Sequence, residues 1–227
     1  MPNSCWRLAK PCAVARHQND VDAIWLQLAN AQVWRRYALG GLGALAVAAL
    51  LWVRSAWPDG GWVHEGLEWL GLCCLVVAIL GRCGCMLYLG GRKGADLVTD
   101  GPYSISRNPL YVFSLLAVLG IGWQTGSFVV GLVLASLAWL VFRWIIGQEE
   151  HLLRAAFSPR FDLYCARVPR FGPRFGLWTS PQHAMVDLSS VWRTLRDAAP
   201  YFLAIPLFEA IEAAQNAGWL HAWLAVI

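Results

Sequence analysis

The sequence predicts an all-α, multi-pass integral membrane protein, a helical bundle of four to five spans that contains a tight helical hairpin. Of its 227 residues, 58% are hydrophobic and only 14% are charged, and the mean hydropathy is +0.47. Soluble domains carry about 25% charged residues, so the usual water-facing shell is missing here. The 14 tryptophans agree with this, because tryptophan gathers at membrane–water interfaces. The net charge of +4 forms no basic patch of the nucleic-acid-binding type.

The distribution of apolar residues divides the chain into three regions. Residues 1–36 are a polar tail and an amphipathic helix, which either lies on the membrane surface or caps a soluble face. Residues 37–175 are the membrane-embedded core, and residues 176–227 are a C-terminal extension with an apolar helix. The first strongly apolar run begins near Tyr37, which is too late for a signal peptide.

Two apolar runs predict the first spans of the core. Tyr37 to Val53 is free of charge over 17 residues, just long enough to cross a membrane. A second run extends from Gly66 to Gly91 and is interrupted by Glu68 and Arg82. Because an arginine is costly in lipid, Arg82 either faces the protein interior or extends its side chain to the interface.

The next uncharged run, Leu110 to Phe142, predicts a helical hairpin. A single straight helix of that length would measure about 50 Å, well beyond the hydrocarbon thickness. Turn residues at 122–127 divide the run, so we expect one arm at about 109–123 and the other at about 127–146. A polar amphipathic helix should follow, and Ser158-Pro159 should start another short helix.

The C-terminal extension leaves its topology open. Tyr201 to Ile227 is apolar apart from Glu209 and Glu212, and Pro206 should kink a helix there. A kinked span, a re-entrant pair and a helix along the interface all fit this pattern. The two glutamates argue against a plain lipid-facing span.

Seven cysteines raise the question of disulfides or a metal site. Their number is odd and no CxxC pair occurs, so we interpret them as small, buried apolar residues and predict no metal site. A metal site at Cys83 and Cys85 remains an alternative, although no histidine is near them in the sequence.

Positive charge predicts the orientation in the membrane. Lysines and arginines precede the first predicted span, follow the second and follow the fourth, whereas the opposite turns hold little charge. The positive-inside rule therefore places the N-terminus, the polar stretch 99–111 and the segment around Glu149 in the cytoplasm. Two polar segments far apart in the sequence should meet at this face.

The polar stretch (99–111) carries the residues best suited to chemistry. Its prolines and glycine interrupt the helix, and irregular backbone at a membrane boundary must be buried in protein or line a wet cavity. The forked guanidinium of Arg107 can bind a carboxylate or a phosphate. Glu149 and Glu150 point about 100° apart on a helix, so both cannot serve one ligand atom. Alternatively, these charges only anchor helix ends.

Two motifs occur in order, with the predicted hairpin between them. The first consists of Leu97-Val98-Thr99-Asp100-Gly101-Pro102-Tyr103 and Arg107-Asn108-Pro109-Leu110-Tyr111. The second consists of Glu149-Glu150-His151-x-Leu153, then Phe157, Phe161, Tyr164 and Val168-Pro169-Arg170-Phe171. Together they resemble the superfamily of isoprenylcysteine carboxyl methyltransferases and phospholipid methyltransferases, over roughly residues 66–175. Arg82 also stands where members of that superfamily often have a basic residue.

The resemblance implies a methyltransferase that uses S-adenosylmethionine, similar to the carboxyl O-methyltransferases, with its pocket at the cytosolic face. It implies catalytic roles for Arg107 and Glu150. The cofactor-binding residues that it implies are Tyr103, Asn108, Pro109, Tyr111, Glu149, Glu150, Tyr164 and Arg167. Many members have histidine in place of Asn108; asparagine does not titrate, so Asn108 receives no acid–base role.

We expect a lipophilic small molecule or a lipidated substrate as the methyl acceptor, reached among membrane lipids in a bacterial inner membrane, and no nucleic acid as partner. One alternative is an NADPH-dependent membrane reductase of the sterol or fatty-acyl type. In that case basic residues would bind the 2′-phosphate, namely Arg160, Arg167, Arg170 and Arg174. The other alternative is a non-catalytic membrane module that binds a partner or a lipid.

Overall fold

The computed structural model describes residues 53–57, 60–90, 96–182, 186–220 and 224–226, together with single positions between 37 and 51. The predicted tail and amphipathic helix at 1–36 lie outside these residues. The predicted span from Tyr37 to Val53 is described only at scattered positions.

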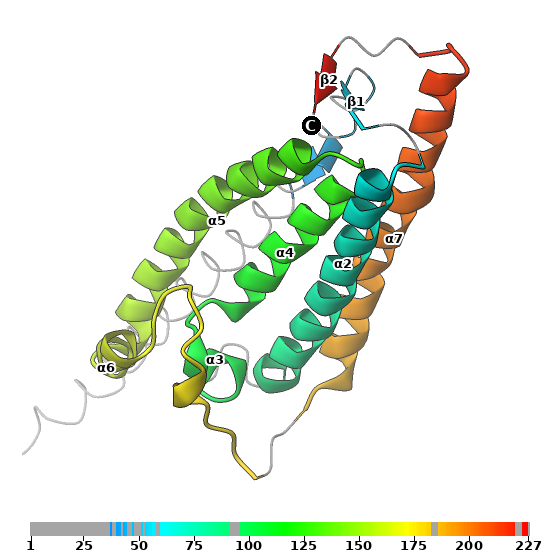
Figure 1. Cartoon of the computed structure of the whole chain (residues 1–227). Coiled ribbons are helices and arrows are strands. Elements are labelled where there is room, and N and C mark those ends of the chain that lie inside the picture. The colour runs from blue at the N-terminus through cyan, green and yellow to red at the C-terminus, as the bar shows by residue number, and fades with distance from the viewer. Residues whose placement is uncertain are drawn as a thin grey trace, which may run out of the picture.

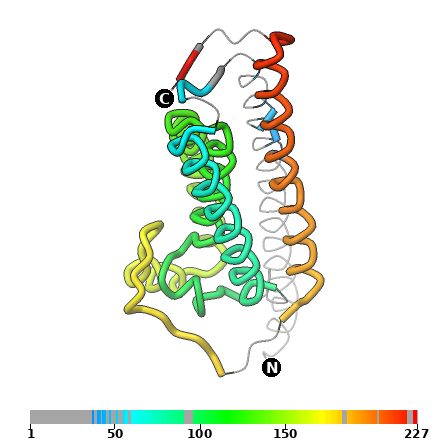
Figure 2. The backbone as a smooth tube through the Cα atoms, turned by 45° about the vertical axis from the view of Figure 1, so that its right-hand side comes forward, coloured from blue at the N-terminus to red at the C-terminus, as the bar shows by residue number. Residues whose placement is uncertain are grey.

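Four long helices dominate the described part of the chain and pack side by side (Figure 1). They are α2 (Trp62–Leu89), α4 (Pro109–Trp123), α5 (Phe128–Phe157) and α7 (Leu188–Asn216). Helix α4 packs against both α2 and α5, while α7 runs along α2 (Figure 2). The all-α prediction is therefore confirmed.

The shorter elements lie at the two ends of the helices. Helices α3 (Pro102–Ile105) and α6 (Arg160–Arg167) and the 3-10 turn η1 (Phe175–Leu177) are at one end. At the other end, strands β1 (Val53–Ser55) and β2 (Leu224–Val226) form a parallel pair, in which Val53 aligns with Leu224.

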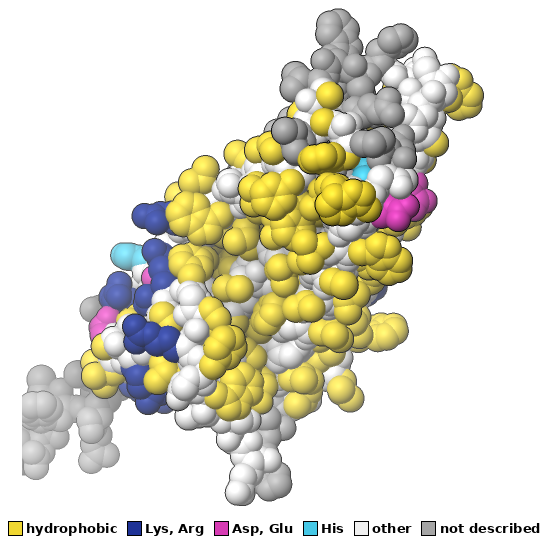
Figure 3. Space-filling model, viewed as in Figure 1, with side chains coloured by type: hydrophobic (Ala, Val, Ile, Leu, Met, Phe, Trp, Pro, Cys, Tyr) yellow, Lys and Arg dark blue, Asp and Glu magenta, His cyan; other side chains and the backbone are white. Residues whose placement is uncertain are grey.

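Two described helices, α2 and α5, are long and apolar enough to cross a membrane, each with a mean hydropathy of 2.2 over its most apolar window. Only 28% of each window is buried inside the protein, and the other residues of both helices are exposed or half-buried. Figure 3 shows hydrophobic side chains over the long face of the molecule, with lysines and arginines gathered toward one end. The apolar α4 is shorter, so the described residues contain fewer clear spans than the four to five predicted.

The helical hairpin is present, with α4 and α5 joined by a turn at 124–127. Gly126 has φ +64°, a left-handed backbone that favours glycine, and Ser127 Oγ caps α5 by accepting a hydrogen bond from Val130 N. The polar amphipathic helix that was expected to follow the returning arm as far as Phe157 is not a separate helix but the continuation of that arm. Helix α5 runs through Gly147 to Phe157 without a break, because the polar residues that follow are good helix formers and no proline occurs until Pro159.

Small residues let α4 approach its neighbours closely. A Cβ atom on Gly71 of α2 would lie 2.7 Å from the carbonyl oxygen of Gly120, so the two backbones are in contact. Arg82 faces inward from α2, because its guanidinium donates a hydrogen bond to Ser114 Oγ on α4. The interior alternative predicted for this arginine is thus the one observed.

The long element in the described part of the C-terminal extension is one continuous helix, α7, and these residues show no re-entrant pair. Asp187 caps its start by accepting from Ser189 N, and the helix runs on through Pro200 and Pro206. Packing along α2 keeps it helical despite the two prolines.

Candidate functional site

The polar stretch starts with a tight turn that leads into α3. Gly101 has φ +59°, and a Cβ atom there would lie 2.5 Å from the ring of Tyr88, so only glycine fits. Pro102 follows as the first residue of α3, where its missing N–H costs nothing. Helix α3 then buries Tyr103 and Ser104 beneath the surface.

The segment after α5 wraps around the polar stretch and fixes its backbone. Arg107 N donates to the carbonyl oxygen of Pro169 at 2.9 Å, and Ser106 Oγ donates to that of Phe171 at 2.8 Å. These bonds join residues about sixty positions apart. The Arg107 side chain is therefore presented from a fixed backbone and not from a free loop.

Glu150, near the end of α5, makes three polar contacts. Its Oε1 atom lies 3.5 Å from Arg107 Nη1 and accepts a hydrogen bond of 3.4 Å from Asn108 Nδ2, while its Oε2 atom lies 3.3 Å from Arg170 Nε. The side chains of Arg107 and Glu150 are only 16% and 15% exposed. We call Arg107, Asn108, Glu150 and Arg170 the Glu150 cluster.

The Glu150 cluster carries two guanidinium groups and one carboxylate, so one positive charge is in excess. Arg107 Nη1 also donates to Cys165 Sγ at 2.7 Å, whereas its Nε is buried and makes no hydrogen bond within the described part of the chain. A buried donor without an acceptor is costly. The arrangement therefore suits an additional anionic group, such as a carboxylate, placed against Arg107.

An apolar cavity of about 200 Å³ adjoins the Glu150 cluster, between α4 and α5. Its lining residues are Tyr111, Val112, Leu115, Trp139, Phe142, Phe171 and Gly172. Phe171 directly follows Arg170 in the chain, so apolar and charged surfaces meet at this point. A ligand with a charged group and an apolar portion could contact both.

The other residues assigned to the site take up different positions. Pro109 is the buried first residue of α4, and Tyr111 packs edge-on against Phe142 with ring centroids 5.1 Å apart. Tyr164 is buried on α6 and donates to the carbonyl oxygen of Tyr103 at 2.7 Å. Burial raises the pKa of the Tyr164 phenol, so it stays protonated and remains a donor.

Two of the assigned residues stand apart from these contacts. Arg167 is exposed at the end of α6. Glu149 is half-buried and lies one position before Glu150 on α5, which turns it about 100° away from the Glu150 side chain.

Two residues of this site were not assigned to it from the sequence. Arg170 was considered only for the reductase alternative, although it belongs to the second motif. Cys165 was interpreted as an apolar residue, which is incomplete because its sulfur accepts from Arg107. The signal for Arg170 was its place in the motif; no sequence pattern marked Cys165.

Comparisons with known proteins find one matching family model and two relatives that are similar over most of their length. Residues 69–160 match the family model described as phospholipid methyltransferase. The nickel-cobalt-cadmium resistance protein NccN of Alcaligenes xylosoxydans xylosoxydans is 36% identical over 177 residues, which cover 78% of this chain and 82% of that protein. The cobalt-zinc-cadmium resistance protein CzcN of Cupriavidus metallidurans is 39% identical over 176 residues, covering 78% and 81% respectively.

A third relative is similar over a shorter region. The protein-S-isoprenylcysteine O-methyltransferase of Schizosaccharomyces pombe is 36% identical over 78 residues, which cover 34% of this chain and 33% of that protein. No solved structure matches the chain.

Proposed function

Because the chain belongs to the superfamily of phospholipid and isoprenylcysteine carboxyl methyltransferases, we propose that it transfers a methyl group from S-adenosylmethionine to a lipophilic acceptor at a membrane face. One observation carries the proposal. The Glu150 cluster holds an excess positive charge and a buried donor, Arg107 Nε, that makes no hydrogen bond to the residues that the structure describes, and an apolar cavity lies beside it.

The chemistry suits a poorly hydrated site. S-adenosylmethionine supplies a methyl group bound to a positively charged sulfur. When the acceptor is a carboxylate, its oxygen forms a bond to the methyl carbon as the carbon–sulfur bond breaks, and opposite charges disappear together. A site with little water favours such a step, because it solvates separated charges poorly. The protein must mainly hold nucleophile, methyl carbon and sulfur in line.

Three members of the Glu150 cluster have a role in that positioning. Arg107 binds a carboxylate, either that of the acceptor or that of the methyl donor, through its buried Nε and its fixed guanidinium. Glu150 accepts hydrogen bonds from hydroxyl or ammonium groups of the donor. If the acceptor is an amine, Glu150 is also the base within reach to remove its proton. Asn108 orients Glu150.

The remaining assigned residues complete the pocket in this proposal. Tyr103, Pro109 and Tyr111 form the wall that joins α3 to α4. Tyr164 fixes that wall through its hydrogen bond to the Tyr103 backbone. Glu149 and Arg167 lie at the rim, where they would contact the donor as it enters.

The cavity supports a lipophilic acceptor. Its lining is aromatic and aliphatic, and it lies between α4 and α5. An acceptor could thus enter sideways from the lipid while its reactive group meets Arg107. A carboxylate on a lipidated molecule combines the two features that the site offers.

We propose that the protein is a multi-pass protein of a bacterial inner membrane, with the Glu150 cluster at the cytoplasmic face. Helices α2, α4 and α5, the run from Tyr37 to Val53 and α7 would supply the four to five spans. Lysines and arginines gathered at the α6 end support this orientation (Figure 3).

The two relatives that match over most of their length are named for metal resistance. NccN is named for resistance to nickel, cobalt and cadmium, and CzcN for resistance to cobalt, zinc and cadmium. We propose that methyl transfer by this chain serves tolerance of such ions in the cell. A strain that lacks the gene should regain growth on metal salts with the wild-type chain but not with the Glu150→Gln variant. Equal growth with the wild-type chain and with Glu150→Gln would show that metal tolerance does not depend on methyl transfer.

Cofactor binding tests the proposal directly. Equilibrium dialysis of the purified full chain in detergent would use radiolabelled S-adenosylmethionine in one arm and NADPH in the other. We expect saturable binding of S-adenosylmethionine, weakened at least about tenfold by Arg107→Ala and Glu150→Ala, since each removes a charged contact. Arg196→Ala, an exposed position on α7, is the control and should bind normally. Binding of NADPH alone would favour the reductase alternative, and no binding of either would contradict the proposal.

A further inference from the structure

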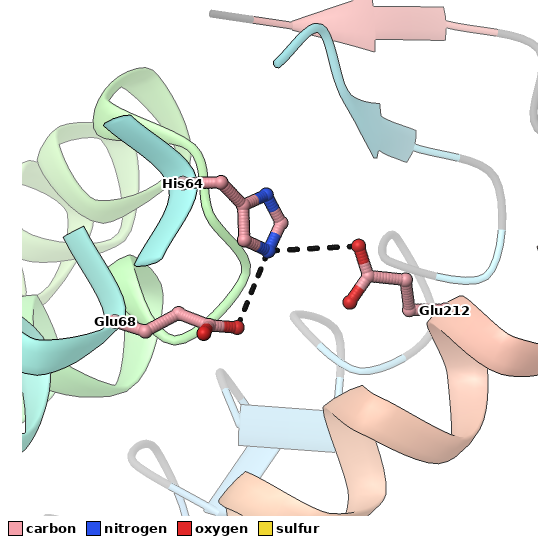
Figure 4. Close-up of side chains that lie close together, drawn as sticks. All are labelled: His64, Glu68 and Glu212. Carbon is pink, nitrogen blue, oxygen red and sulfur yellow. Dashed lines mark hydrogen bonds and ion pairs between the residues drawn. The ribbon is translucent and has the colours of Figure 1, made fainter. Parts of the chain in front are cut away.

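A second polar cluster lies at the end of the bundle opposite to the Glu150 cluster. His64, in the first turn of α2, points its Nε2 atom between two carboxylates (Figure 4). This nitrogen lies 3.2 Å from Glu68 Oε1 and 3.5 Å from Glu212 Oε1. Glu68 is on α2 and Glu212 is near the end of α7, so the cluster joins two helices.

The donor atoms are spaced as ligands of a small metal ion. Zinc binds nitrogen and oxygen at about 2.0–2.2 Å, and in a tetrahedral site its ligand atoms are therefore about 3.3 to 3.5 Å apart. The two distances from His64 Nε2 agree with these tetrahedron edges. All three donor atoms lie within 4.8 Å of one another, so a small rotation of either glutamate side chain would complete the set.

The surroundings hold the imidazole and Glu68 in place. The His64 side chain is only 5% exposed, and a Cβ atom added to Gly126 would lie 2.2 Å from its ring, so the hairpin turn packs directly against the histidine. Gln124 Nε2 donates to the backbone carbonyl oxygen of Glu68 at 2.6 Å. Ser55 Oγ in turn donates to the carbonyl oxygen of Gly126 at 2.9 Å. A preorganised first set of ligands is what a binding site requires.

Charge also favours a cation here. The carboxylates of Glu68 and Glu212 would each bring one negative charge to an ion at this position, and their side chains are 33% and 28% exposed. The two charges together match a divalent ion. The Nδ1 atom of His64 is buried and makes no hydrogen bond within the described residues.

We propose that His64, Glu68 and Glu212 bind one divalent transition-metal ion of the zinc type. Imidazole together with carboxylates suits Zn²⁺ and Co²⁺, whereas Mg²⁺ and Ca²⁺ prefer oxygen ligands only. Three protein ligands leave a fourth position for water or an exchanging ligand. The site ties α7 to α2 and is independent of the proposed methyl transfer, since it shares no residue with the Glu150 cluster.

The competing explanation is an ion-paired histidine that only links the two helices. Both explanations place polar atoms at similar distances, but they differ in what happens when metal is added. A metal site takes up one equivalent of Zn²⁺ and becomes harder to unfold with increasing metal concentration. An ion-paired histidine does neither.

The test uses the purified full chain in detergent, stripped of metal and titrated with ZnCl₂ by calorimetry. We expect one equivalent to bind, with Mg²⁺ and Ca²⁺ failing to compete. Glu68→Gln and Glu212→Gln should weaken Zn²⁺ binding at least about tenfold. Metal affinity falls by about that factor even when the residue removed only orients a metal ligand. Glu65→Gln on α2 and Glu209→Gln on α7 are exposed, matched controls that should bind as the wild type does.

Titration with Co²⁺ identifies the ligand type. Nitrogen and oxygen ligands in a tetrahedral site give visible d–d absorption without the near-ultraviolet thiolate band that any of the seven cysteines would produce. Glu212 is partly exposed, so Glu212→Gln should fold even if a change at His64 does not. No one-to-one binding, a thiolate spectrum, or wild-type affinity in both glutamine variants would overturn the proposal.

Discussion

Replacement of Glu150 by glutamine isolates the charge at the centre of the Glu150 cluster. The side chain keeps its size and one carbonyl oxygen, so the packing around α5 is preserved. Two arginines, however, lose their shared counter-charge at a position where the carboxylate is only 15% exposed. The new amide group also directs N–H donors toward guanidinium donors.

The cost can be estimated from the contacts. Hydrogen bonds to charged groups contribute about 1.5–3 kcal/mol each, and removing one partner of a fully buried ion pair costs about 3–5 kcal/mol. The contacts of Glu150 are long, at 3.3 to 3.5 Å, and Arg170 is 33% exposed. We therefore expect Glu150→Gln to lower the free energy of unfolding by about 2–3 kcal/mol, below the fully buried case.

An exposed ion pair provides the control. Arg154 Nε lies only 2.7 Å from Asp162 Oδ1, closer than any contact of Glu150, but these side chains are 52% and 47% exposed. The hydrogen bond from Arg154 lowers the pKa of the Asp162 carboxyl, so the pair is charged at neutral pH. Water screens such a pair, and Asp162→Asn should therefore have little effect.

Unfolding by SDS in mixed micelles, followed by tryptophan fluorescence, measures both variants. Burial, and not contact distance, should decide the order, so that Glu150→Gln is clearly less stable than Asp162→Asn. Equal stability of Glu150→Gln and the wild type would show that the Glu150 cluster is hydrated and would refute the reasoning.

Further changes test the packing and the two pockets. Gly71→Ala should destabilise the contact of α2 with α4 by about 1–3 kcal/mol, because its Cβ would meet a backbone oxygen. Gly66→Ala, on the open face of α2, should be neutral or slightly stabilising. The same SDS titration measures the stability of both variants. Ser127→Ala removes the cap of α5 and should cost about 1 kcal/mol in that titration. Leu115→Trp should fill the apolar cavity, raising KM for the methyl acceptor while dialysis finds the affinity for S-adenosylmethionine unchanged. Asn108→Asp places a second carboxylate beside Glu150 and should weaken donor binding in the dialysis assay; unchanged binding would remove Asn108 from the site.

Much of the fold follows from the composition of the sequence and from the residues that interrupt its apolar runs. The apolar runs are long, and glycine and polar residues interrupt them at 122–127, so the hairpin and its turn were predictable. The topology of α7 was left open, because Pro206 was expected to kink any helix there, whereas packing against α2 keeps α7 continuous. Helix α5 was predicted as two helices, because the change from apolar to polar residues near 146 was taken for a boundary between them.

The contact between Arg107 and Glu150 was anticipated only in outline. Charge at the ends of the spans placed both segments at one face, but the identity of the partner glutamate depends on the rotation of α5, which sequence does not define. The cluster of His64 and Glu212 could not be foreseen, because it requires α7 to run the length of α2. No local spacing connects residues so far apart in the chain.

The most direct test of methyl transfer is to follow the methyl group itself. Membranes containing the full chain would be incubated with S-adenosylmethionine labelled on its methyl group, and the label then measured in the solvent-extracted lipid fraction. We expect label to accumulate with the wild type and with Asp162→Asn, and to fall to background with Arg107→Ala and Glu150→Gln, provided that each variant is folded. Incorporation that is absent in the wild type, or undiminished when Arg107 and Glu150 are replaced, would contradict the assignment of this site.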